Sequence, residues 1–168
     1  MTPSVRRWFG ITFALYGAAI VQCVYAEKMQ VYGAIPDFLT AAAVLIALFG
    51  DPNRGAAVGF FAGLILAVLA SPPHGGFGSL ILSRTLVCFA VGLLEHRIFR
   101  DHALIALVLV GGGTLAAETL LFVFAPQHNI THWARGMAST TIYNTVLAVP
   151  LYFLIRWIVR PNAEGEDR

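Results

Sequence analysis

The stretch ALIALVLVGGGTLAAETLLFVF, residues 103–124, decides the class of fold. Glu118 is its single charged residue. A helix that crosses the hydrocarbon core of a bilayer needs about 20 predominantly apolar residues, because each residue adds about 1.5 Å along the axis. The stretch meets that requirement and therefore predicts a transmembrane helix.

Five further apolar runs share this character, and turn-forming or polar segments separate them. They cover residues 8–25, 31–49, 55–70, 77–94 and 137–158. The run at 55–70 is short, so we expect it to be tilted or shielded by its neighbours. We predict an all-α membrane protein. It forms a compact bundle of six transmembrane helices over residues 1–160, followed by a disordered cytoplasmic tail over residues 161–168.

The composition of the whole chain agrees with this prediction. Of 168 residues, 58% are hydrophobic and 12% are charged, whereas a soluble domain carries about 25% charged residues. Lipid must therefore be the main solvent. The net charge of +2 is small, and the basic residues are scattered, which excludes nucleic acid as a partner. Cys23 and Cys88 lie in apolar runs and are expected to be buried free thiols, with a disulfide as the alternative.

The first run has an alternative interpretation. Arg6 and Arg7, an apolar stretch and then residues 24–26 form the pattern of a cleaved signal peptide. Because five further runs follow, and polytopic proteins usually retain their first helix, we favour a retained first helix.

The distribution of basic residues predicts the orientation in the membrane. Six helices place both termini on one side. The basic residues expected on that side are Arg6, Arg7, Arg54, Arg97, Arg100, Arg156, Arg160 and Arg168. The other side holds Lys28 and Arg135. The positive-inside rule then predicts cytoplasmic N and C termini.

Three polar residues lie inside the apolar runs at similar depths. Arg84, Glu118 and Asn144 are each about 10 Å below the outer end of their run, counted at about 1.5 Å per residue. Because a charge in hydrocarbon costs several kcal/mol unless it is paired, we predict one polar layer. Arg84 and Glu118 form an ion pair, and Asn144 is a hydrogen-bonding neighbour. This layer is either a structural clasp or a site for a ligand or partner.

Two further features have both a structural and a functional interpretation. Pro36 and Asp37 open the second apolar run; they either begin and cap a helix or form an exposed contact for a partner on the outer side. Gly55, Gly59 and Gly63 repeat every fourth residue and predict one helix face for close backbone packing. That face meets either another helix of the chain or another protein.

Motifs for chemistry are missing from the sequence. His128 and His132 are four residues apart and His74 lies in another outer loop, but no cysteine or carboxylate cluster accompanies them. We therefore predict no metal site and no cofactor. No phosphate-binding glycine loop or nucleophile elbow occurs in the chain, so we predict that it is not an enzyme.

The order and spacing of these stretches resemble the rod shape-determining protein MreD family along nearly the whole chain. The matching stretches are IPDF at residues 35–38, RGAAVGFFAGL at 54–64, VGLLEHRIFR at 91–100, and Tyr143–Asn144 and Pro150–Tyr152 with Arg156 in the last run. One position departs from the pattern: the family often has an aspartate near the end of the third helix, where this chain has Ala67.

The resemblance implies a non-enzymatic subunit of the cell-elongation machinery that makes lateral peptidoglycan in rod-shaped bacteria. It implies an inner-membrane protein that associates with an MreC-like bitopic protein and with the RodA glycosyltransferase and its transpeptidase. It is also linked indirectly to MreB filaments. The family is similar in fold to the substrate-binding subunits of energy-coupling-factor transporters. The alternative function is therefore a membrane subunit that binds a small, vitamin-like solute near Arg84, Glu118 and Asn144.

Overall fold

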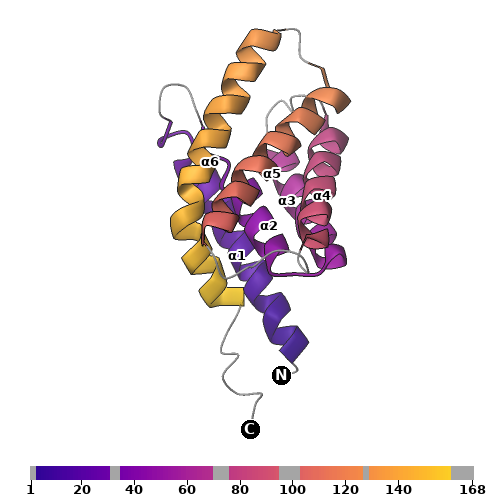
Figure 1. Ribbon diagram of the computed structural model, residues 1–168, viewed down its shortest axis with the longest axis vertical. Helices are drawn as coiled ribbons and strands as arrows, with labels where there is room; N and C mark the ends of the chain where they lie inside the picture. Colours follow the sequence, from indigo (N-terminus) through magenta and orange to yellow (C-terminus); the bar gives the residue numbers. More distant parts are fainter. Residues whose placement is uncertain (1–2, 31–34, 70–75, 95–102, 127–128, 160–168) are drawn as a thin grey trace.

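A computed structural model describes residues 3–30, 35–69, 76–94, 103–126 and 129–159. This part of the chain forms six helices: α1 (Pro3–Tyr25), α2 (Phe38–Leu48), α3 (Pro52–Leu69), α4 (Phe77–Leu93), α5 (Ala103–Phe124) and α6 (Ile130–Val159). The predicted all-α bundle is confirmed, and α1 begins at the end of the molecule where α6 ends (Figure 1). The predicted tail at 161–168 lies outside the described residues, as do His74, His128, Arg97, Arg100, Arg160 and Arg168.

Not all six helices of the described residues are long enough to span a membrane. α1, α3, α5 and α6 are long and apolar enough to cross a bilayer, whereas α2 has 11 residues and α4 has 17. A helix as short as α2 reaches only about 16 Å, about half the hydrocarbon thickness. The helix that contains the run at 55–70 is not short, because it extends beyond the start of that run; the short helices are α2 and α4. α3 begins at Pro52 and has 18 residues.

α2 is short because its start is set by Pro36 and Asp37. The sequence predicted an apolar run from residue 31, yet the described residues 35–37 are not helical. Asp37 is the N-cap, and its side chain accepts a hydrogen bond from the backbone N–H of Thr40 at 2.9 Å. This bond satisfies one of the free N–H groups at a helix start. The predicted capping role of Asp37 is thus observed, at a helix that begins later than expected.

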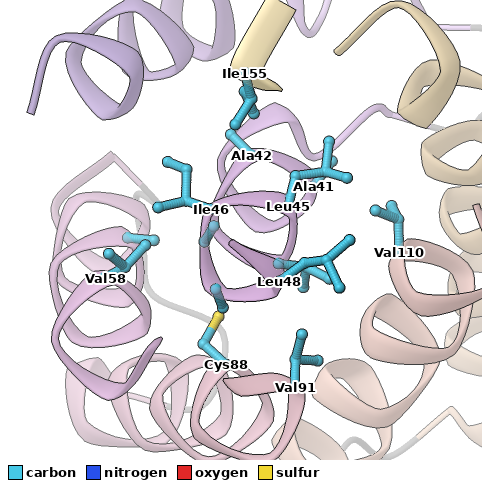
Figure 2. Close-up of a cluster of buried hydrophobic side chains, with 14 of the residues drawn as sticks. Ala41, Ala42, Leu45, Ile46, Leu48, Val58, Cys88, Val91, Val110 and Ile155 are labelled. Atoms are coloured by element: carbon cyan, nitrogen blue, oxygen red, sulfur yellow. The ribbon is translucent and has the colours of Figure 1, made fainter. Parts of the chain in front are cut away.

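The short helix lies at the centre of the bundle. Every residue from Phe38 to Leu48 is buried, and α2 contacts all five other helices. Figure 2 shows side chains of α2 surrounded by Val58 of α3, Cys88 of α4, Val110 of α5 and Ile155 of α6. Ten of the eleven residues of α2 are apolar, and such a helix is suited to this position because it has no polar face to direct toward water.

The outer faces of the longer helices are apolar as well. Large hydrophobic side chains are exposed on them, including Phe13 at 69%, Leu104 at 76% and Trp157 at 78%. In a soluble protein, so much exposed apolar surface would cause aggregation, whereas lipid accommodates it. Cys23 is exposed on α1, which corrects the prediction that both thiols are buried; Cys88 is buried.

The glycine face of α3 packs against α4 rather than facing outward. A Cβ atom built on Gly63 would lie 2.7 Å from the Cα of Ile81, and those on Gly55 and Gly59 would clash with the backbone carbonyls of Cys88 and Arg84. The two helices form the most extensive helix pair in the described part of the chain. The face formed by the three glycines is therefore covered by α4, a helix of the same chain.

We predict that Gly59→Ala destabilises the protein by about 1–3 kcal/mol, because the added methyl group forces α3 away from the backbone of α4. Thermal unfolding of the purified protein in detergent measures the effect. Gly112→Ala on α5 is the matched control, since a Cβ there meets no atom within 4 Å. Equal stability of the two variants would contradict the packing described for α3 and α4.

Candidate functional site

Arg84 is the centre of a buried polar cluster in the middle of α4. Its side chain is 3% exposed, and its Nη2 atom lies 2.6 Å from Glu118 Oε1 on α5 and 3.4 Å from Asp37 Oδ2. Its other nitrogens donate to hydroxyl groups: Nε to Thr40 at 3.3 Å and Nη1 to Ser83 at 3.0 Å. The guanidinium thus donates through all three of its nitrogens, and the arrangement joins α4, α5 and the start of α2.

Asp37 both caps α2 and forms an ion pair with Arg84. Its Oδ1 accepts the Thr40 N–H, and its Oδ2 accepts both the Thr40 hydroxyl, at 2.5 Å, and the Arg84 guanidinium. The residue is 8% exposed, and Pro36 is buried too. Neither residue is exposed in the chain, and the alternative, a partner contact at Pro36 and Asp37, stays a prediction.

Two amide side chains hold the segment that leads into α2. Asn144 of α6 accepts the Asp37 N–H at 3.0 Å and donates to the Thr114 hydroxyl of α5 at 3.2 Å. Gln22 of α1 accepts the Phe38 N–H at 2.8 Å and donates to the Pro36 carbonyl at 3.2 Å. Together the two amides pair the Pro36 carbonyl and the N–H groups of Asp37 and Phe38, which would otherwise be unsatisfied in an apolar surrounding.

The structure brings together Arg84, Glu118 and Asp37, and places Asn144 beside them. Asn144 forms hydrogen bonds with Asp37 and Thr114, and not with Arg84 or Glu118. Sequence reasoning had separated Asp37 from this layer, and it had not singled out Gln22, Thr40 or Thr114. Counting residues from the outer end of each run could have placed Asp37 in the same layer, because it lies six residues into the run that begins at residue 31.

A cavity of about 260 Å³ lies away from the cluster, between α1, α2 and α6. Its lining is apolar and includes Phe13, Phe38, Leu151 and Ile155. Arg84, Glu118 and Asn144 take no part in it. Within the described ranges, no three metal-ligating side chains come together. The ion pairs of Arg84 join α4 to α5 and to the residue that caps α2.

Comparison with known proteins identifies a family. A family model described as rod shape-determining protein MreD matches residues 3–161. No curated protein and no solved structure matches the chain, so the expected structural likeness to energy-coupling-factor transporter subunits has no support from solved structures.

We predict that Arg84→Leu destabilises the protein by about 3–5 kcal/mol, because two carboxylates then lose their buried cation. Adding Glu118→Leu should recover part of the loss. Adding Asp37→Asn as well, which keeps a capping side chain, should recover more. Thermal unfolding in detergent gives the order of stabilities. If each added substitution instead lowers the stability further, the charges of these three side chains do not compensate one another.

Proposed function

The chain belongs to the MreD family of rod shape-determining proteins, a family of non-enzymatic membrane proteins, and on that premise we propose that it is a scaffold of the cell-elongation complex. Its role there is to hold the machinery for lateral peptidoglycan synthesis together in the membrane. The observation that carries the proposal is the family match, which extends from residue 3 to residue 161 and so includes every described helix.

The interior of the bundle supports a scaffold. α2 fills the centre with buried apolar side chains, and the polar groups beside it bond to one another. The glycine face of α3 holds α4 at backbone contact distance. A body packed in this way presents constant outer faces to neighbouring proteins, which is what an assembly subunit needs.

The alternative, a subunit that binds a vitamin-like solute, needs a pocket with several polar side chains directed into it. The cavity between α1, α2 and α6 is lined by apolar side chains. In transporters with broken membrane helices, the positive N-terminal end of a half-helix can bind an anionic solute. Here the N-terminal end of α2 is capped by the chain's own Asp37. Both observations favour the scaffold over the carrier.

The proposed location is the bacterial inner membrane with both termini in the cytoplasm. The helices alternate in direction, so Arg54 at the start of α3 and Arg156 at the end of α6 lie at the end where α1 begins. Lys28 and Arg135 lie at the opposite end, after α1 and in the first turns of α6. This distribution supports the orientation through the positive-inside rule.

The proposed partners are an MreC-like bitopic protein and the RodA glycosyltransferase with its transpeptidase, with MreB filaments linked indirectly. We predict that the tagged protein, solubilised from its own host's membranes in mild detergent, co-purifies with the MreC-like protein, as mass spectrometry would show. An unrelated polytopic protein with the same tag is the control. Absence of any shape-determining protein from the purified material, with the tagged protein intact, would contradict the proposal.

A further inference from the structure

The buried cluster has an excess of negative charge. Arg84 contributes one positive formal charge, whereas Asp37 and Glu118 contribute two negative ones. Within the described residues, Arg84 is the one cation at ion-pair distance from either carboxylate. α1 and α6 contribute the neutral amides of Gln22 and Asn144. A net charge at this depth in hydrocarbon costs several kcal/mol unless another group compensates it.

The two carboxylates differ in how fully they are satisfied. Both oxygens of Asp37 accept hydrogen bonds, and the residue caps the positive end of α2. Glu118 accepts one bond, from Arg84 to Oε1; its Oε2 has no hydrogen-bond donor among the residues that the structure describes. The Glu118 side chain is also the more exposed of the two, at 19% against 12%. The uncompensated charge therefore resides at Glu118.

Glu118 lies at the border between the buried and the exposed side of α5. Thr114, Ala117 and Leu121 around it are buried, whereas Leu115, 43% exposed, and Thr119 face outward. The Thr119 hydroxyl donates to the backbone carbonyl of Leu115 and so is not available to Glu118. An approaching helix would meet an apolar surface with a single carboxylate oxygen to satisfy.

We propose that Glu118 is the contact point for a transmembrane helix of another protein that carries a lysine or arginine in the outer half of the membrane. The complementary charge would satisfy Oε2 and bring the cluster to neutrality. The partner's cation, itself costly in lipid, would be satisfied by the same contact. This inference rests on the proposed function, since it gives the chemistry of one contact within the complex.

The test uses the full-length protein in its native membranes, with a photo-crosslinking residue in place of Leu115. We expect a cross-linked transmembrane segment that contains a lysine or arginine. Glu118→Gln should lower the cross-link yield about tenfold without lowering the thermal stability of the purified protein, because the amide oxygen still accepts from Arg84. Thr119→Val, on the same surface, is the matched control and should change neither quantity.

A double-substitution cycle then tests the pair directly. Replacing the partner's basic residue with glutamine should lower the yield as much as Glu118→Gln does, and combining the two changes should add no further loss. Three results would overturn the inference: a yield unaffected by Glu118→Gln, independent losses that add, or cross-links confined to the chain itself, including the loop with His74. None of these would affect co-purification with shape-determining proteins, whose failure counts against the proposed function instead.

Discussion

A guanidinium group buried in a membrane protein must be surrounded by acceptors, and the structure is organised around that requirement. Arg84 is 3% exposed, and two carboxylates and two hydroxyls accept its hydrogen bonds. These acceptors come from α4 itself, from α5 and from the start of α2. Because a buried charge without partners costs several kcal/mol, the three segments are held at one depth and in one order around it.

The position of α2 follows from this cluster. Asp37 has to reach Arg84, so the helix that it caps begins within the bundle rather than at its surface, and only 11 residues remain before the turn into α3. A helix that short can be central because ten of its eleven side chains are apolar, its one hydroxyl (Thr40) is paired with Asp37 and Arg84, and the five other helices surround it. Gly55, Gly59 and Gly63 then let α3 approach α4 closely enough to complete the enclosure.

The sequence alone predicted the helices better than the contacts among them. Long apolar runs locate α1, α3, α5 and α6 because lipid demands length and hydrophobicity of each segment separately. Counting residues from the run ends placed Arg84 and Glu118 at one depth, since helix rise is constant. The same count failed at α2, whose start depends on Asp37 and on a tertiary contact with Arg84. The roles of Gln22 and Thr40 were likewise unpredictable, because amides and hydroxyls at helix ends have many local partners to choose from.

Inside the membrane, one arginine binds two carboxylates, one on α5 and one that caps α2. Solid-state NMR of the protein in lipid bilayers, with nitrogen-15 in arginine and carbon-13 in the carboxyl groups, measures these contacts through dipolar couplings. The structure predicts that the Arg84 guanidinium couples to the carboxyl carbons of both Glu118 and Asp37, with the stronger coupling to Glu118. Coupling to neither carboxylate, or to Glu118 alone, would mean that Arg84 does not position the start of α2.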